Sequence, residues 1–254
     1  MKADRSAQIQ HYLYASGPAS VQAIAAAVGA SLATVRRDLH LLQTSGTIRR
    51  DHGSARIADR AGVEVAFAQR EQQNLAAKRA IAGAAHARLT PGSTVFLDAG
   101  TTTLQLARRL RLNPIALNLI TNCIPIALEL SGVPQITVTL LGGRLRPENA
   151  SMVGSLTERA LNDLWFDQVF LGVGAVAPDA CIYSLDPDEA RANAQMLTRA
   201  STATLLTDAS KFGRSLTWKV AALTAQLGII TDAGLPSDWR RRLADIGCPL
   251  QVAP

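Results

Sequence analysis

The chain has 254 residues, of which 48% are hydrophobic and 18% are charged, and its formal net charge is +6. This composition supports a large buried core and excludes a disordered chain. Apolar runs are shorter than the roughly 20 residues that a membrane helix needs, and the start of the chain lacks the pattern of a secretory signal. We therefore expect a cytoplasmic protein that has no membrane partner.

Three cysteines, at positions 123, 181 and 248, lie far apart in the sequence. Their spacing lacks the close pairs that bind zinc, and their odd number argues against a disulfide framework. We interpret them as the reduced thiols of a cytoplasmic protein. Neither a metal site nor a cofactor is predicted.

Apolar residues recur at helical spacing in three segments near the start of the chain. The first segment ends at Gly17-Pro18 and the second at Gly29, and both are residue types that stop helices. Ser31 is a favourable N-cap for the third segment. The apolar faces of the three predicted helices are formed by Ile9, Tyr12 and Leu13, then by Val21, Ile24, Ala25 and Val28, and then by Leu32, Val35, Leu39 and Leu42.

The third predicted helix has the layout of a helix that enters the major groove of DNA. Its outer face carries Thr34, Arg36 and Arg37, while its apolar face points inward. Two short strands around a turn at 52–54 follow and complete a winged helix-turn-helix. The strands are expected at 47–50 and 55–57, and the candidate DNA-binding residues are Ser31, Thr34, Arg36, Arg37, Arg49, Arg50, His52 and Arg56.

The distribution of charge supports this interpretation. Residues 1–57 carry seven basic and three acidic side chains, so most of the net charge lies in less than a quarter of the chain. A basic excess is what the neutralisation of DNA phosphates requires. The alternative is a three-helix module that contacts another protein and uses its arginines for solubility. The presence of arginines in both the predicted recognition helix and the wing favours DNA binding.

From residue 93 the sequence alternates short β-rich runs with helical ones. Such alternation predicts a parallel α/β sheet with helices on both faces. Residues 58–74 are expected to connect two domains, 1–57 and 75–254. The strands are expected at 94–97, 115–121, 136–141, 169–171, 204–206 and 228–231, and the helices at 76–89, 103–110, 124–130 and 189–199.

Ligands of parallel sheets bind beyond the carboxyl ends of the strands, so the loops there form a candidate site. The loop from Asp98 to Thr103 ends one predicted strand and opens a helix, where free backbone N–H groups attract anions. Alone, this loop would be interpreted as a well-capped helix start. Three further strand ends carry small, polar or cationic residues, namely Thr121-Asn122, Gly142-Gly143-Arg144, and Asp208 with Ser210 and Lys211. Together they predict a site for a phosphorylated polyol.

The predicted recognition helix contains Ala33-Thr34-Val35-Arg36-Arg37-Asp38-Leu39, and the predicted wing contains Gly46-Thr47-Ile48-Arg49-Arg50-Asp51-His52-Gly53. These two segments resemble the signature of DeoR-type bacterial repressors. The chain departs from this signature at Val35, where isoleucine is usual, and at Ser54, where a second glycine is usual. The connector is also similar, and an effector signal would have to pass through it; its matching residues are Glu64, Phe67 and Arg70, followed by Lys78, Ile81 and Ala82.

The second domain resembles the sensor domain of the same family, which is related to sugar-phosphate isomerases such as ribose-5-phosphate isomerase. The matching motifs include Leu97-Asp98-Ala99-Gly100-Thr101-Thr102, Thr121-Asn122, Gly142-Gly143, Glu189-Ala190 and Asp208-x-Ser210-Lys211-Phe212-Gly213. The resemblance implies an effector that is a phosphorylated sugar or sugar derivative. Its phosphate would meet Gly100, Thr101, Thr102 and Lys211, and its sugar end would lie near Asp98, Asn122, Arg144 and Glu189. Thr103 and Gly143 complete the candidate effector site.

One segment departs clearly from the family. The pattern Gly-x-Asp-Gly-Ile-Asp is replaced by Gly172-Val173-Gly174-Ala175-Val176-Ala177. An isomerase needs a positioned base to move a proton, and both carboxylates of this pattern are missing. We therefore predict a ligand-binding domain and not an enzyme.

The whole sequence predicts a DNA-binding repressor of a sugar or polyol operon that forms a homo-oligomer, either a dimer or a tetramer. Its partners would be a double-stranded DNA operator and the effector, which would bind the DNA-competent and DNA-incompetent arrangements with different affinities. Two alternatives stay open at this point. One is a sugar-phosphate isomerase with a DNA-binding appendage, and the other is a ligand-free oligomeric DNA-binding protein.

Overall fold

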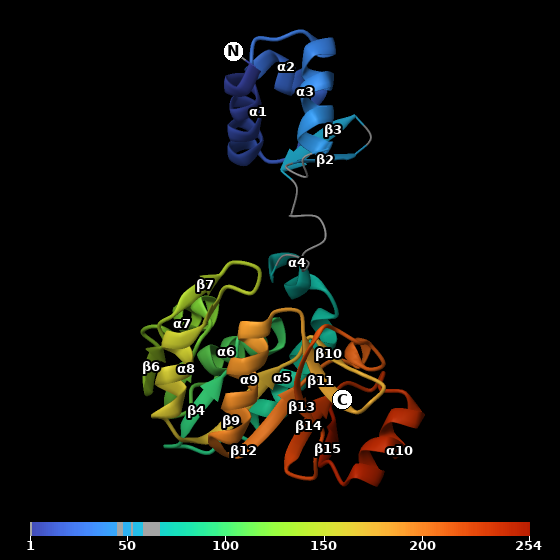
Figure 1. The fold of residues 1–254 in the computed structure, drawn as a ribbon. Coiled ribbons are helices and arrows are strands. Elements are labelled where there is room, and N and C mark those ends of the chain that lie inside the picture. The colour runs from blue at the N-terminus through green and yellow to red at the C-terminus, as the bar shows by residue number, and fades with distance from the viewer. Residues whose placement is uncertain (1, 45–47, 52, 58–66) are drawn as a thin grey trace. The chain divides into compact units, whose positions relative to one another are not determined.

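The computed structural model describes residues 2–44, 48–51, 53–57 and 67–254 (Figure 1). The chain divides into two compact units, Met1–Val65 and Ala66–Pro254, and each unit has its own hydrophobic core. The second unit includes residues 67–74, which the sequence analysis assigns to the connector. The expected domain boundaries at residues 57 and 75 stay predictions.

The first unit packs three helices against a small antiparallel sheet, which is the architecture of a winged helix-turn-helix. The helices are α1 (Lys2–Ser16), α2 (Val21–Ala27) and α3 (Leu32–Thr44), and the strands are β1 (Ala19–Ser20), β2 (Ile48–Asp51) and β3 (Ser54–Ile57), in the order β1-β3-β2. Ile9, Ile24, Val35 and Leu39 are fully buried in its core. The predicted fold of this unit is therefore confirmed. Strand β1 was not predicted, because two residues carry no periodic pattern.

One residue of the predicted apolar face of α3 is not buried in the core. Leu32 is 40% exposed, whereas Val35, Leu39 and Leu42 are buried as expected. Helical spacing fixes the direction in which a side chain points from the helix axis. It does not determine whether neighbouring elements extend far enough along that axis to bury the side chain. Leu32 is the first residue of α3, about one turn beyond Val35, so its assignment to the core was wrong.

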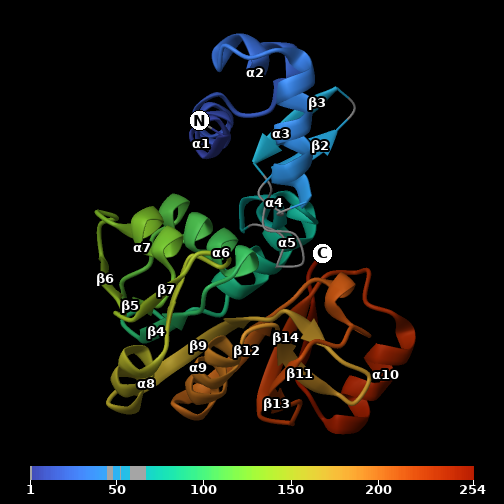
Figure 2. The same cartoon turned by 45° about the horizontal axis from the view of Figure 1, so that its top comes forward.

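The second unit is built on a seven-stranded parallel sheet with the order β15-β14-β12-β9-β4-β5-β6. The strands are β4 (Thr94–Leu97), β5 (Leu117–Thr121), β6 (Ile136–Leu140), β9 (Phe166–Gly172), β12 (Ala200–Leu206), β14 (Leu227–Thr231) and β15 (Leu250–Val252). Figures 1 and 2 show this sheet between two layers of helices. The prediction of a parallel α/β sheet is thus confirmed.

Each face of this sheet has its own core, because successive side chains of a strand point to opposite faces. On β4, Val95 and Leu97 join the core under one layer of helices, and Phe96 joins the core under the other. The first layer consists of α5 (Leu75–His86), α6 (Thr101–Leu112) and α7 (Ile124–Leu130), and the second of α8 (Ser155–Asn162), α9 (Pro187–Thr198) and α10 (Ser237–Ile246).

Smaller elements surround the carboxyl ends of the strands. Strands β7 (Arg144–Arg146) and β8 (Ser151–Val153) form a hairpin, and β10 (Ala175–Val176), β11 (Cys181–Ser184) and β13 (Trp218–Ala222) form a second antiparallel sheet. The short helix α4 (Phe67–Gln72) precedes α5, and a 3₁₀ turn, η1 (Ala209–Lys211), follows β12. None of these elements was predicted from the sequence.

All three cysteines are buried and free, in agreement with their interpretation as reduced thiols. Burial raises the pKa of the Cys123 thiol to about 12, so this thiol stays protonated at neutral pH. In the described parts of the chain, none of the helices is both long enough and apolar enough to span a bilayer.

Candidate functional site

The recognition helix α3 begins with a local cap that the sequence predicts. The Thr34 N–H donates to Ser31 Oγ at 3.3 Å, and the two hydroxyl oxygens lie 2.9 Å apart. Arg36 and Arg37 follow in the first turns and are both exposed. The start of the helix therefore presents hydroxyl and guanidinium groups to solvent, which is the chemistry that contacts base edges and phosphates.

A partly buried ion pair holds α3 against α1. Arg5 Nε donates to Asp38 Oδ2 at 2.6 Å, and the Asp38 side chain is 1% exposed. Asp38 therefore does not face DNA but ties the recognition helix to the first helix of the unit. Its exposed neighbour Arg37 points away from this contact, because successive residues of a helix point about 100° apart.

The wing is described only in part. Strands β2 and β3 pair from Ile48 with Ile57 to Asp51 with Ser54, so the predicted turn at 52–54 is shorter by one residue. The Arg50 side chain is partly exposed. His52 and the side chains of Arg49 and Arg56 lie outside the described residues, and their roles stay predictions.

In the second unit, parallel pairing brings the predicted loops to one edge of the sheet. Strand β4 lies between β5 and β9, and β12 follows β9, so the carboxyl ends of these strands are neighbours. We call the loop 98–103 and the residues that contact it the strand-end site. Lys211 lies after β12, two strands away from β4.

Asp98 is the buried acid of this site. Its side chain is 1% exposed, and Oδ2 accepts a hydrogen bond from the Gly172 N–H at 3.2 Å. Oδ1 is also buried and has no hydrogen-bond partner among the described residues. Burial raises the pKa of Asp98 well above its ordinary value, and the negative charge of Glu189 raises it further.

Asn122 and Thr121 fix the loop that carries Asp98. Asn122 Oδ1 accepts from the Ala99 N–H at 3.1 Å, and Thr121 Oγ1 donates to the Leu97 carbonyl oxygen at 2.6 Å. Both side chains are buried. These contacts show that Asn122 positions the loop. Its contact with an effector stays a prediction.

Helix α6 begins inside the strand-end site. Its N-cap is Gly100, which has no side chain to accept from the first backbone N–H groups. Thr101 and Thr102 are buried, and Thr103 Oγ1 donates to the Gly100 carbonyl oxygen at 2.8 Å. The helix starts at Thr101, two residues before the predicted start, so all three threonines lie in its first turn.

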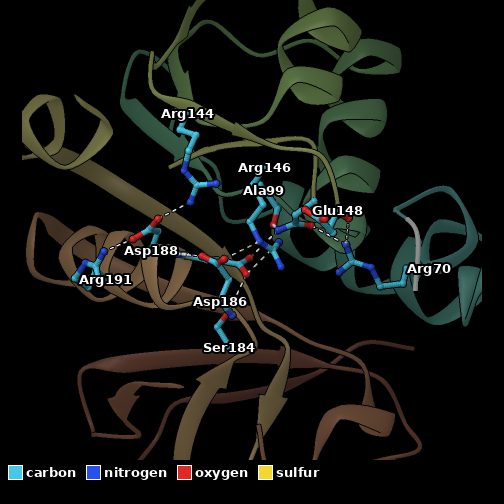
Figure 3. Close-up of polar contacts among 11 residues, drawn as sticks. Arg70, Ala99, Arg144, Arg146, Glu148, Ser184, Asp186, Asp188 and Arg191 are labelled. Carbon is cyan, nitrogen blue, oxygen red and sulfur yellow. Dashed lines mark hydrogen bonds and ion pairs between the residues drawn. The ribbon is translucent and has the colours of Figure 1, made fainter. Parts of the chain in front are cut away.

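Glu189 belongs to a polar cluster of which Figure 3 labels Arg146, Ser184 and Asp186. Its Oε1 accepts from Asn149 Nδ2 at 2.7 Å, and its Oε2 accepts from Ser184 Oγ at 2.7 Å and lies 3.4 Å from Arg146 Nη1. The buried Arg146 also pairs with Asp186 at 3.4 Å. The sequence analysis named Glu189 but missed Asn149, Arg146 and Ser184, which no spacing connects to it.

The contacts of Gly143 and Arg144 are with other parts of the protein and indicate structural roles. A Cβ atom on Gly143 would lie 2.2 Å from Thr157 Oγ1 and 2.8 Å from the Val153 carbonyl oxygen, so only glycine fits there. Arg144 is exposed and pairs with Asp188 at 2.5 Å, and Asp188 also pairs with Arg191 (Figure 3). The structure therefore places Arg144 in an ion-pair chain at the rim of the cluster.

A second polar group surrounds the end of β12. Asn74 Nδ2 donates to Asp208 Oδ1 at 2.9 Å and to Ser210 Oγ at 3.2 Å. The neighbouring Lys78 is only 3% exposed. Burial lowers its pKa to about 8, although the negative charge of Asp208 opposes this shift and the positive charge of Lys211 adds to it. Lys211 and Lys78 thus bring two cations to the end of β12.

The segment that lacks the family's carboxylates is apolar in the structure as well. Ala175, Val176 and Ala177 are buried, and Ala175 and Val176 form β10. A general base at this position is therefore absent from residues 172–177, all of which are described. In the described part of the chain, no group of three or more potential metal ligands gathers.

A winged helix-turn-helix with exposed arginines, joined to an α/β unit with polar strand ends, defines a DNA-binding regulator with a separate sensor domain. Residues 5–61 match the model of the DeoR-like helix-turn-helix domain, and residues 73–233 match that of the DeoR C-terminal sensor domain. The chain belongs to the DeoR family of transcriptional regulators.

Curated relatives extend over nearly the whole chain. The HTH-type transcriptional regulator GlpR of Haloferax volcanii is 36% identical over 97% of this chain and 96% of its own. The HTH-type transcriptional repressor CsqR of Escherichia coli K12 is 32% identical over 90% of this chain and 87% of its own. The glycerol-3-phosphate regulon repressor of Escherichia coli K12 is 28% identical over 86% of both chains. These relatives are named as regulators of transcription and not as enzymes.

Solved structures resemble part of the chain. Ribose 5-phosphate isomerase A of Methanocaldococcus jannaschii is 16% identical, covers 55% of each chain and has a TM-score of 0.40. This likeness concerns the fold alone, and no activity follows from it.

Proposed function

We propose that this protein represses an operon of sugar or polyol metabolism in the cytoplasm, and that a phosphorylated sugar or sugar derivative modulates its binding to operator DNA. The family assignment supports the DNA-binding half of this proposal. The strand-end site supports the effector half. A homo-oligomer, at least a dimer, follows from the few base pairs that one recognition helix can contact.

The observation that carries the effector proposal is the start of α6. Its first backbone N–H groups open at the strand-end edge behind a glycine N-cap, with the hydroxyls of Thr101 and Thr102 beside them. Such a helix start favours an anion, and a phosphate oxygen accepts from several N–H groups at once. Lys78 and Lys211 add positive charge at the end of β12.

Two further observations agree with a binding role. The relatives include a repressor named for the glycerol-3-phosphate regulon, and glycerol 3-phosphate is a phosphorylated polyol. The buried apolar residues 175–177 offer no base for proton transfer, so a ligand held at this edge would be bound without being isomerised.

A thermal-shift screen tests the effector half directly. The purified protein is heated with phosphorylated sugars, polyol phosphates and sugar acids, each beside its unphosphorylated form. A ligand at one hundred times its Kd stabilises the native state by about 2.7 kcal/mol, so a shift with only the phosphorylated member of a pair is the expected result. If no phosphorylated compound raises the melting temperature, the effector proposal fails and the DNA-binding assignment stands.

Lys211 gives a second test of the same site. The change Lys211→Met removes the charge but keeps an unbranched stem, so operator affinity should stay unchanged while the response to the phosphorylated compound is abolished. Operator binding is measured by fluorescence anisotropy with and without that compound. The matched control is Lys219→Met, an exposed lysine on β13. A full response in the Lys211 variant would show that the phosphate binds elsewhere.

A further inference from the structure

Helix α4 is fastened to the rest of the second unit mainly by polar contacts. Glu71 Oε1 pairs with Arg108 Nη1 of α6 at 2.7 Å, and Lys78 Nζ donates to the Arg70 carbonyl oxygen at 2.5 Å. Phe67 adds an apolar contact at the edge of one core. Because α4 is the first described element after residues 58–66, its attachment sets where the chain enters the second unit.

The third polar contact of α4 leads directly to the strand-end site. Arg70 Nη2 donates to the Glu148 carbonyl oxygen at 3.0 Å and to Asn149 Oδ1 at 2.9 Å. Figure 3 shows the Arg70 side chain reaching from α4 toward the loop between β7 and β8. One buried amide of that loop is thus among the groups that attach α4.

Asn149 connects three separate segments of the chain through this amide. Its Oδ1 accepts from Arg70, and its Nδ2 donates to the Ala99 carbonyl oxygen at 3.0 Å and to Glu189 Oε1 at 2.7 Å. The side chain is 2% exposed. One planar group therefore joins α4, the loop that opens α6, and the start of α9.

The three contacts of Asn149 depend on one another. A hydrogen bond from a charged guanidinium to Oδ1 polarises the amide and strengthens both bonds that Nδ2 donates. The amide is planar, so a rotation that improves one contact weakens the others. A displacement of Ala99 or Glu189 therefore weakens the hydrogen bond between Asn149 and Arg70. By linkage, a displacement of Arg70 weakens the contacts of Asn149 with Ala99 and Glu189.

We infer that Asn149 is a positioning residue that couples the strand-end site to the attachment of α4, and that this coupling is how occupancy of the site is transmitted toward the DNA-binding unit. The inference rests on the proposed effector site and adds its regulation. Arg144, Asp188 and Arg191 form an ion-pair chain at the rim of the same cluster, and Asn149 is a hydrogen-bonded link between the cluster and α4.

Hydrogen exchange on the full-length, ligand-free protein tests this inference. Three variants are compared in peptides that cover 67–74 and 98–103, with β14 as the reference for global stability. Arg70→Met removes the donor to Asn149, and Glu71→Gln removes a different polar contact of the same helix. Asn149→Asp keeps the acceptor for Arg70 but removes both donors to the site.

The coupling predicts a specific pattern. Arg70→Met should speed exchange in both peptides by at least about fivefold, since each lost hydrogen bond is worth about that factor and the change removes two, to Asn149 Oδ1 and to the Glu148 carbonyl oxygen. Glu71→Gln should speed exchange in 67–74 alone. Asn149→Asp should speed exchange in 98–103 while 67–74 stays protected, because a carboxylate still accepts from Arg70. Exchange in β14 should not change in any variant.

Each other pattern overturns the inference. If Arg70→Met affects 67–74 alone, α4 is attached without any coupling to the site. If Glu71→Gln also reaches 98–103, or if Asn149→Asp loosens β14 equally, the effect is general destabilisation. Because the exchange experiments use no ligand, their result is independent of the thermal-shift screen. A failed screen would refute the effector proposal and leave the coupling intact. A failed exchange pattern would refute the coupling and leave the effector proposal intact.

Discussion

The Asp98 side chain is 1% exposed; its Oδ2 accepts from the Gly172 N–H, while its Oδ1 is buried without a hydrogen-bond partner among the described residues. Burial deprives an ionised carboxylate of its hydration, and the hydrogen-bonding groups of Ala99, Gly172 and Asn122, which lower the pKa of Asp98, do not offset this cost. Protonation removes this cost, which is why its pKa lies well above the ordinary value of 3.8. The residue therefore stabilises the folded state most when it is neutral.

This pKa gives a signed prediction for stability. Above pH 3.8 the unfolded state loses the Asp98 proton while the folded state keeps it, so the contribution of Asp98 to stability falls as pH rises toward the raised folded pKa. Asp98→Asn keeps the acceptor for Gly172 and carries no charge. The free energy of unfolding of the variant, from urea titrations between about pH 5 and 8, should exceed that of the wild type increasingly as pH rises.

The opposite trend would show that Asp98 is stabilised as a carboxylate. Glu189→Gln serves as the companion variant, because removal of its charge should reduce the pH dependence without abolishing it. Burial is the larger cause of the shift and remains in that variant.

Helix α3 carries a prediction of its own, because its first turns present two adjacent exposed guanidinium groups. Replacement of Arg36 and Arg37 by alanine should weaken operator binding and lower the slope of log affinity against log salt by about one for each phosphate that is no longer neutralised. Fluorescence anisotropy at several salt concentrations measures both quantities.

The control for α3 removes the same charge elsewhere. Arg241 and Arg242 are exposed on α10, in the other unit. Their replacement by alanine should change neither affinity nor slope appreciably. Equal effects of the two double variants would mean that net charge, and not the recognition helix, determines DNA binding.

Elements differ in how far the sequence predicts them. Helix α7 was predicted with both ends correct, at Ile124 and Leu130, since Pro125 at its start and Gly132 after its end are strong boundary signals. Strand β9 extends over Phe166–Gly172, more than twice the predicted length, because its polar residues Asp167 and Gln168 interrupt the apolar run. Pairing with β12 and β4 keeps these residues in the strand.

At the scale of the whole molecule, the two units have separate cores, so we expect them to unfold separately. Val35→Ala should destabilise the first unit by about 1–3 kcal/mol and leave the second unchanged. All three tryptophans, at 165, 218 and 239, lie in the second unit. Tryptophan fluorescence should therefore show an unchanged transition while circular dichroism shows an earlier one.

Val169→Ala in the core of the second unit is the matched change, and it should move the fluorescence transition. If Val35→Ala moves the fluorescence transition by the same amount, the units unfold as one cooperative body. A concentration-dependent transition would in addition indicate the expected oligomer.

The sequence by itself determined the winged helix-turn-helix, the parallel sheet and the presence of Asp98 and Asn122 near strand ends. These features depend on local periodicity, on capping residues and on the rule that parallel strands gather their carboxyl ends at one edge. The family assignment has the same origin, because its motifs are continuous runs of the chain.

Only the tertiary structure brought Arg70, Asn149, Ser184 and Glu189 into one cluster. These residues come from a helix, a hairpin loop, a strand end and a second helix, and no periodic pattern relates their positions in the sequence. Tertiary packing also decided that Asp38 faces Arg5 and that Leu32 is exposed. Local patterns specify which elements form, whereas the contacts between distant side chains depend on how those elements pack.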